Sequence, residues 1–149
     1  MLRSVLGAAA VATAMSLTLP VAPAAADKED PLEGLTVHPE WGSITGHSGV
    51  LRKGCRTYTF SYSITPPEGV WAIEVFINGP GLKRLGGGAF LQGYDGESGT
   101  GSYKLCRYTT RYGRFTIQAK LSVDDGYGNI TEGKLPADHY RLHRKHEGD

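Results

Sequence analysis

Two segments in which apolar and polar side chains alternate, 55–64 and 70–78, constrain this chain more than any other feature. In the first, serine or threonine separates bulky apolar residues; in the second, Trp71 begins an apolar series that recurs at every second position. A period of two is typical of β-strands that bury one face. Pro66 and Pro67 lie between the segments and cannot donate to a strand ladder, so they predict a turn. We therefore expect the core to form around these two strands.

The rest of the chain also favours strands over helices. All but one of the 21 glycines lie beyond residue 26, mostly between apolar runs, which is typical of many tight turns. The cleanest alternation runs from Phe115 to Val123 and predicts a central, half-buried strand. No stretch beyond residue 26 has helical periodicity, so we predict an all-β domain. Further strand candidates are 35–37, 43–45, 89–92, 100–108 and 139–144.

The N-terminal segment 1–26 has the order of a secretory signal peptide. Arg3 precedes an apolar run, and three alanines ending at Ala26 stand before the first acidic residue. The alternative, a membrane anchor, is disfavoured because the run is interrupted and is shorter than the ~20 residues that a spanning helix needs. We expect cleavage after Ala26, secretion of the protein, and no membrane span after cleavage.

Three regions are predicted beyond the signal peptide. These are a flexible leader over 27–34, a folded domain over 35–144 and a charged tail over 145–149. The secreted chain would carry 15 Lys and Arg against 15 Asp and Glu, because cleavage also removes Arg3. This balance argues against nucleic-acid binding, which depends on a basic face.

The chain has two cysteines, Cys55 and Cys106. Disulfides persist outside the cell, and two free thiols would be exposed to oxidation there. We therefore predict that they form one disulfide.

Between Val75 and Asn129 the sequence resembles bacterial immunoglobulin-like modules of the PKD and fibronectin III kinds. The similarity lies in the segments 75–81, 101–105, 113–119 and 123–126, with Asn129 beyond. It implies a single immunoglobulin-like β-sandwich of about seven antiparallel strands, with 55–64 and 100–108 as neighbours and the two cysteines at adjoining ends. The family often has a tyrosine near Phe115 that holds the corner before this strand, so the corner must be held differently here.

Strand parity predicts one candidate binding face. If Trp71 and the apolar residues at every second position after it face the core, the side chains between them face outward. They would lie beside the outward side chains of the strands predicted over 113–123 and 139–144. An exposed aromatic with a polar rim is typical of a binding anchor. The alternative is that the loop near Leu82 folds back and covers Phe76. The predicted face consists of Phe76, Glu74, Gln118, Lys120 and Arg141.

A second candidate is the one cluster of basic and aromatic residues, over 107–114. Guanidinium groups and aromatic rings suit an anionic polysaccharide or a phosphate surface. The alternative is a corner whose tyrosines pack and whose arginines are solvated. The cluster consists of Arg107, Tyr108, Arg111, Tyr112 and Arg114.

Metal sites and catalysis are disfavoured. His139 and His143, four apart on a strand, would lie roughly 13 Å apart, too far for one zinc ion. The oxygens of 124–129 lack the ligand spacing of a calcium loop, and no catalytic or cofactor motif is present. We therefore predict no enzyme, metal or cofactor. The function predicted is binding to an extracellular protein or a cell-envelope polysaccharide; the alternatives are a carbohydrate-binding module and a small secreted inhibitor or ligand carrier.

Overall fold

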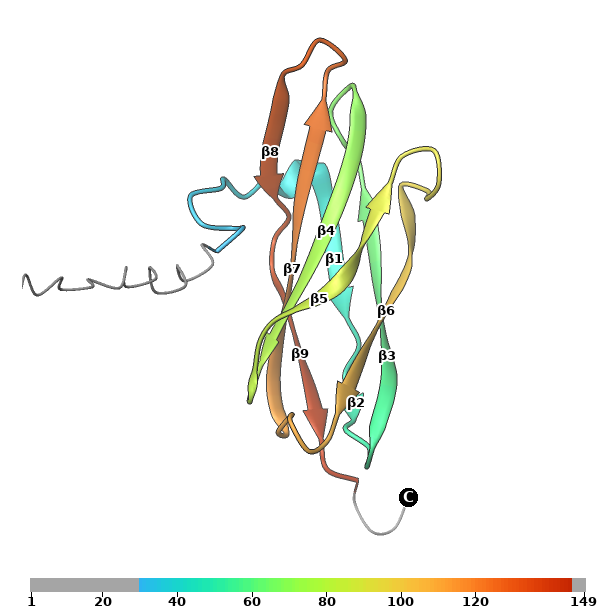
Figure 1. The fold of residues 1–149 in the computed structure, drawn as a ribbon, viewed down its shortest axis with the longest axis vertical. Helices are drawn as coiled ribbons and strands as arrows, with labels where there is room; N and C mark the ends of the chain where they lie inside the picture. The colour runs from blue at the N-terminus through green and yellow to red at the C-terminus, as the bar shows by residue number, and fades with distance from the viewer. Residues whose placement is uncertain (1–29, 146–149) are drawn as a thin grey trace, which may run out of the picture.

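Residues 30–145 are described by the computed structural model, which is built almost entirely of β-strands (Figure 1). One short 3-10 helix, η1, precedes them. Its bounds are Pro39–Trp41, and the strands are β1 Gly42–Gly46, β2 Gly49–Val50, β3 Cys55–Ile64, β4 Val70–Gly79, β5 Leu82–Leu91, β6 Ser98–Cys106, β7 Gly113–Asp124, β8 Ile130–Lys134 and β9 Asp138–His143. The predicted signal peptide lies outside the described residues. Within 30–145 no helix is long and apolar enough to cross a membrane.

The strands form two sheets, with the orders β1-β3-β6 and β2-β9-β7-β4-β5. This confirms the predicted immunoglobulin-like sandwich, with two differences from about seven antiparallel strands. Nine strands are present, and β2 pairs with β9 in parallel. Both β8 and β9 pair with β7, at opposite ends of it, because Pro136 interrupts what would otherwise be one long strand.

Strand parity is confirmed on two neighbouring strands of the larger sheet, β4 and β7. Trp71, the first of the inward series on β4, is 3% exposed, and the other members are at most 1% exposed. On β7 every inward side chain from Phe115 to Val123 is at most 3% exposed. The core between the sheets therefore consists of the residues that the period-two pattern selects.

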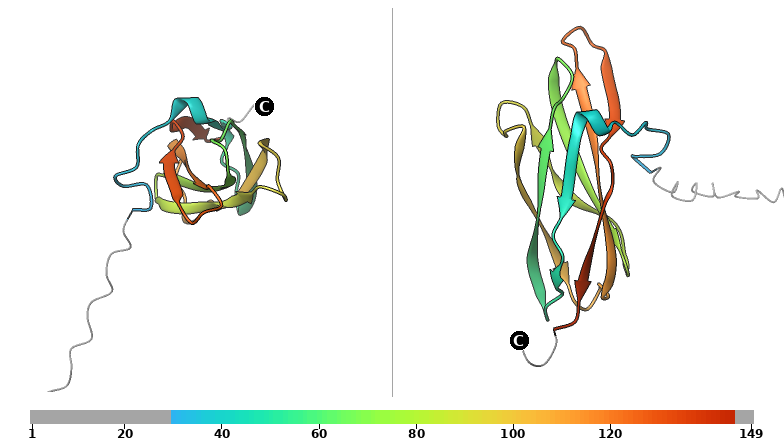
Figure 2. Two further views of the ribbon diagram at one scale, coloured as in Figure 1. Left: turned by 90° about the horizontal axis from the view of Figure 1, so that it is seen from above. Right: turned by 180° about the vertical axis from the view of Figure 1, so that it is seen from behind.

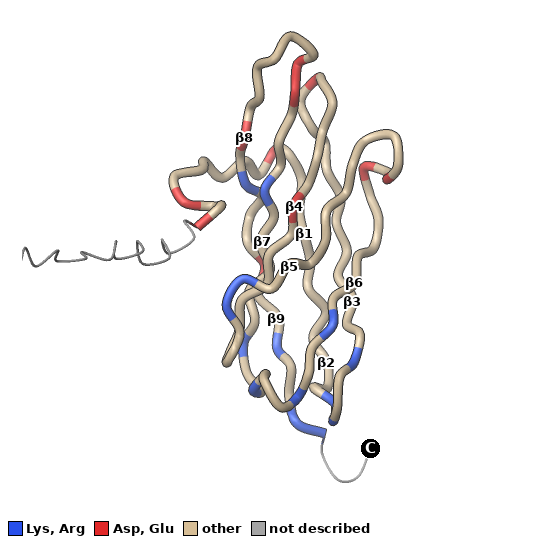
Figure 3. The backbone as a smooth tube through the Cα atoms, viewed as in Figure 1, with Lys and Arg blue, Asp and Glu red and all other residues tan. Residues whose placement is uncertain are grey.

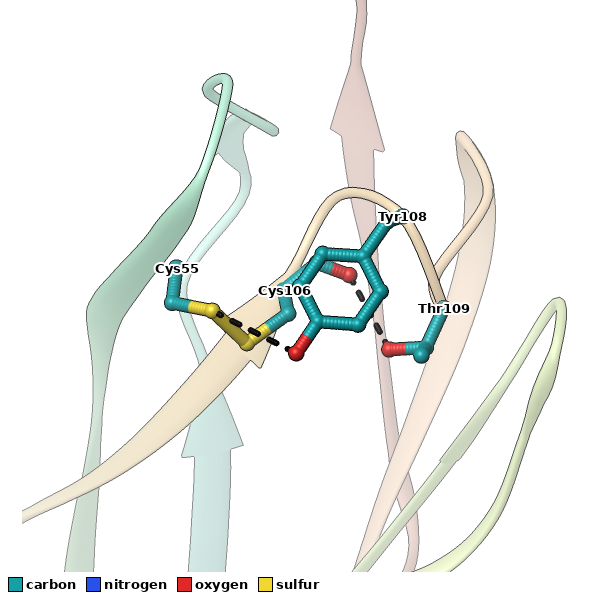
Figure 4. The surroundings of a disulfide bond; sticks show 4 residues. All are labelled: Cys55, Cys106, Tyr108 and Thr109. Carbon is teal, nitrogen blue, oxygen red and sulfur yellow. Dashed lines mark hydrogen bonds between the residues drawn. A yellow bond between two sulfur atoms is a disulfide. The ribbon is translucent and has the colours of Figure 1, made fainter.

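The disulfide is also confirmed. Cys55 and Cys106 are register partners on β3 and β6, at the end of the ladder that these neighbouring strands share (Figure 4). The bond therefore links two strands within one sheet and does not cross the core.

Where the sequence predicts only a short strand over 89–92, the structure has the ten-residue strand β5. It pairs with β4 through a bulge at Gly86–Gly88, where Val75 and Phe76 lose the regular register. A Cβ on Gly87 would lie 2.7 Å from the Val75 side chain, and Gly88 has a φ of 118°. The glycines therefore permit a bulged strand lying close to its neighbour and do not mark a loop.

The far end of β5 reaches across to the other sheet (Figure 1). There Phe90 packs edge-on against Phe60 at 6.0 Å and lies 4.6 Å from the ring of Tyr62, between ring centroids. This strand therefore covers one open side of the sandwich.

The described part of the predicted flexible leader is packed. Residues 30–34 form a turn, Leu32 is 5% exposed, and its carbonyl accepts a hydrogen bond from Lys134 Nζ. Further on, His38 stacks on the buried Trp41 with ring centroids 3.8 Å apart. A buried leucine and a stacked ring attach this segment to the sandwich, which corrects the prediction for residues 30–34.

Inside the sandwich, Tyr103 of β6 and Tyr140 of β9 join the two sheets. Their hydroxyl oxygens lie 2.7 Å apart and share a buried hydrogen bond. Burial raises the pKa of Tyr103 to about 12, and burial together with the bond to Tyr103 raises the pKa of Tyr140. Both rings therefore favour the neutral form in the folded state.

We expect alkali to destabilise the protein through this pair. A raised pKa in the folded state means that the unfolded chain loses its protons first, from pH about 10. The stabilisation is thus complete below pH about 10 and is lost as the pH rises toward 12. The melting temperature at pH 8 and pH 11 measures the effect, with Tyr103→Phe/Tyr140→Phe as the control. An equal alkaline loss in that variant would assign the effect to other groups.

Candidate anion-binding site

Charged residues are segregated along the long axis of the molecule (Figure 3). Antiparallel strands send alternate connections to opposite ends. The connections 65–69, 92–97 and 125–129 carry Asp or Glu and no Lys or Arg; residues 51–54 and 107–112 carry only basic charges. One end of the sandwich is therefore acidic and the other basic.

We call the end of the sandwich that carries the basic connections the basic end. It comprises the connections 51–54, 80–81 and 107–112, the strand portions beside them, and the chain after β9. Its Lys and Arg residues are Arg52, Lys53, Arg56, Lys83, Arg84, Lys104, Arg107, Arg111, Arg114, Arg141, Arg144 and Lys145.

Ion pairing does not neutralise this end. The ion pairs that involve a lysine both belong to Lys120, in the middle of β7, with Glu74 at 2.8 Å and Glu132 at 3.3 Å. The hydrogen bond with Glu74 is the main cause of the raised pKa of Lys120. With Arg84 left aside, no Lys or Arg of the basic end forms an ion pair with a carboxylate of residues 30–145. Its positive charges therefore sum to a positive electrostatic potential at this end of the molecule.

Two arginines stand face to face within this end. Arg114 of β7 and Arg141 of β9 are register partners on the outer face of the larger sheet. Directly opposed side chains on neighbouring antiparallel strands lie close together, and like charges placed so destabilise a sheet. Neither guanidinium has a hydrogen-bond, ionic or aromatic partner among the described residues. All their N–H donors are therefore available to a ligand.

The arginine pair lines a hollow of about 380 Å³ that is open to solvent. Ser48, His139 and the largely buried Tyr140 complete its lining. Ser48 Oγ accepts a hydrogen bond of 3.0 Å from the backbone N–H of Arg141, which leaves the serine hydroxyl free to donate. Four polar side chains thus face one shallow hollow.

The predicted basic and aromatic cluster lies at the corner between β6 and β7, and the structure divides it by role. Arg107 donates from Nη1 to the carbonyl of Thr110 at 2.9 Å, and its guanidinium lies 4.1 Å from the ring centroid of Tyr112. This corner is therefore held by an arginine. Arg111 is exposed, and its backbone N–H bonds to the carbonyl of Pro80.

Tyr108 belongs to the same corner and is 80% exposed. Its hydroxyl lies 3.9 Å from Cys55 Sγ, so the ring lies beside the disulfide, while Thr109 Oγ1 donates to the carbonyl of Cys106 (Figure 4). Of the five predicted residues, Tyr108, Arg111 and Arg114 remain accessible to a ligand.

The predicted binding face has the expected orientation, but its members do not form one site. Phe76 is half-buried on the outer face between its register partners Gln118 and Gly86. Because β5 lies beside β4, it does not fold back over Phe76. Glu74 and Lys120 neutralise each other, and Arg141 belongs to the hollow. A protein partner on this face stays a prediction.

Oxygen-rich and histidine-rich segments do not converge into a metal site. Asp125 is occupied within its hairpin, where its carboxylate accepts hydrogen bonds from the backbone of Tyr127 and from the backbone and side chain of Asn129. These bonds, above all that from the Asn129 side chain, lower the pKa of Asp125. Between residues 30 and 145, no three His, Cys, Asp or Glu residues are grouped to hold a metal ion.

Sequence reasoning missed the basic end because it summed charges over the whole chain. A usable signal was present: from residue 51 to residue 129, connections that carry Asp or Glu alternate with connections that carry only Lys and Arg or no charge. Combined with antiparallel topology, this alternation predicts segregated ends. From the sequence, Arg114 and Arg141 could be predicted to point outward, but not to be register partners.

Comparison with known proteins assigns no family to this chain. No protein-family model matches it, and no curated protein matches it either. The immunoglobulin-like arrangement therefore rests on the observed strand order, and the resemblance to PKD and fibronectin III modules stays a prediction.

Proposed function

We propose that this protein is an exported, non-catalytic binding module whose basic end holds an anionic polysaccharide of the cell envelope. The observation that carries this proposal is the concentration of Lys and Arg at one end of the sandwich without neutralising carboxylates. Export rests on the sequence of residues 1–26, and the disulfide suits an oxidising compartment.

A polymer suits this surface better than a small molecule does. The cations are spread over two connections, the strand portions beside them and the chain after β9, so one small ligand would reach only a few of them. A polyanion can contact many and release its counterions as it binds. Tyr108, 80% exposed at the corner between β6 and β7, adds a ring on which a sugar can stack.

The opposite charge of the other end sets the orientation of the bound protein. An anionic surface attracts the basic end and repels the connections that carry Glu68, Asp95 and Asp125. The molecule would thus stand on the polymer with its acidic end outward. That end presents exposed apolar residues, including Tyr94 and Tyr127, about 90% exposed, which a further partner would meet first.

Binding to polygalacturonate, a purely carboxylate polysaccharide, tests the proposal. We expect binding to weaken by about tenfold or more between 50 and 200 mM NaCl, because several contacts between carboxylates and basic side chains each exchange for salt ions. Neutral dextran of equal length should not bind. As a matched control, Asp95→Asn/Glu97→Gln alters the acidic end and should leave the affinity unchanged or slightly higher.

Three outcomes would contradict the proposal. Equal binding to dextran would remove the role of charge, and binding that does not respond to salt would remove the electrostatic mechanism. Double-stranded DNA bound as tightly as a phosphate-bearing polymer such as poly(glycerol phosphate) at the same salt concentration would show that the surface recognises polyanions in general.

A further inference from the structure

We infer that the hollow lined by Arg114, Arg141, His139 and Ser48 is a discrete subsite for a phosphoryl group. This inference rests on the proposed function and deepens it, because it names the chemical group of the polymer that the basic end selects. A phosphate-bearing envelope polysaccharide would place one phosphodiester in the hollow while its neighbouring units cross the rest of the basic end.

The donors around the hollow come from three separate segments. Arg114 lies on β7, Arg141 and His139 on β9, and Ser48 in the connection between β1 and β2. Because neither guanidinium has a partner among the described residues, each offers its fork of N–H groups to a ligand. The two forks approach from neighbouring strands, so one group between them can contact both.

The histidine and serine add donors of another kind. His139 Nδ1 lies 3.0 Å from the hydroxyl of Thr116. When that hydroxyl donates to Nδ1, the proton of the neutral ring lies on Nε2, which then donates. The serine hydroxyl can donate as well, since Ser48 Oγ already accepts from the backbone of Arg141.

Such a donor set suits a phosphoryl group better than a carboxylate. A carboxylate offers two oxygens in one plane, and a single arginine fork can satisfy both. Four donors from different directions match a tetrahedral group with several anionic or accepting oxygens. The cross-strand repulsion between the two arginines is also relieved when a ligand brings negative charge between them.

The test compares two double variants that each remove two positive charges from the basic end. Arg114→Ala/Arg141→Ala removes both arginines from the hollow, and Arg56→Ala/Lys104→Ala removes one charge each from β3 and β6 of the other sheet. Poly(glycerol phosphate) is the probe, and polygalacturonate is the carboxylate comparison. We expect the first variant to lose at least about tenfold in affinity for the phosphate polymer, and the second about threefold. For polygalacturonate the two losses should be similar.

Arg114→Lys/Arg141→Lys distinguishes geometry from charge. It keeps both positive charges but removes the two planar guanidinium groups. A phosphoryl subsite should then still lose affinity for poly(glycerol phosphate), whereas a surface that binds only through its summed charge should not. Melting temperatures of all variants show that the comparison is made on folded protein. Equal losses in the two alanine variants, or full affinity in the lysine variant, would overturn the subsite and leave the proposed function intact.

Inorganic phosphate provides a readout that does not depend on any polymer. We expect it to shift the Nε–H signals of Arg114 and Arg141 in NMR spectra, and acetate at the same ionic strength to leave them in place. If phosphate shifts these signals but no polyanion binds the protein, the subsite would stand and the proposed function would be wrong. Equal shifts with acetate would overturn selectivity for a phosphoryl group.

Discussion

Replacement of both cysteines, as Cys55→Ser/Cys106→Ser, is expected to lower the free energy of unfolding by about 4 kcal/mol. The bond closes a loop with a sequence separation of 51 residues, and its loss returns that conformational freedom to the unfolded chain. A compact unfolded state would reduce the effect, because it already restricts the chain. Urea denaturation of the variant and the oxidised wild type measures the difference.

The disulfide is expected to act on the unfolded chain more than on the native structure. On β3 and β6 the register pairing continues from the cysteines for the full length of β3 to Ser63, so the ladder holds these strands together without the bond. The variant should therefore keep the wild-type far-ultraviolet circular dichroism spectrum at 20 °C. A loss of less than about 1 kcal/mol would contradict the entropic account.

Truncation of Phe60 is expected to cost a similar amount, about 4 kcal/mol. The ring is fully buried and lies at the junction of three strands, with ring centroids 6.0 Å from Phe90 and 6.3 Å from Tyr103. A Cβ on Gly101 would lie 2.2 Å from this ring, so the backbone of β6 packs directly against it. Phe60→Ala leaves a cavity that a rigid backbone cannot close.

Phe76→Ala is the matched control for this measurement. It removes the same side chain from the outer face, where Gly86 leaves one side of the ring without a neighbouring side chain. We expect a loss of about 1 kcal/mol, because only part of the ring leaves water on folding. A loss near 3 kcal/mol in Phe76→Ala would mean that the ring is covered and would remove it from any binding face.

Local patterns predicted most of the sandwich because its strands obey a period of two. The inward residues of β4 and β7 and the pairing of Cys55 with Cys106 all follow from parity and from the number of cysteines. β5 was missed because its glycines have the composition of a loop. In the folded strand, Gly87 is a glycine because Val75 and Ile77 of β4 occupy the space that a side chain would need.

The candidate site was only partly predictable. Arg141 and Arg114 were each selected, but as members of different surfaces, and His139 was considered as a metal ligand and as an outward residue of the last strand. Their convergence depends on the register between β7 and β9, which aligns residues 27 positions apart in the chain. The corner residue Arg107 was assigned to a ligand surface, whereas its contacts with Thr110 and Tyr112 show a structural role.

By itself, the sequence determined the all-β class, the buried face of each long strand and the single disulfide. These properties depend on residues that are neighbours along a strand or on a count, so no distant contact is needed to derive them. Only the tertiary structure decided that a chain with nearly balanced charge has one acidic and one basic end, and that two arginines from separate strands share a hollow. The reason is that antiparallel strands return alternate connections to the same end, so charges that are interspersed along the chain are sorted in space.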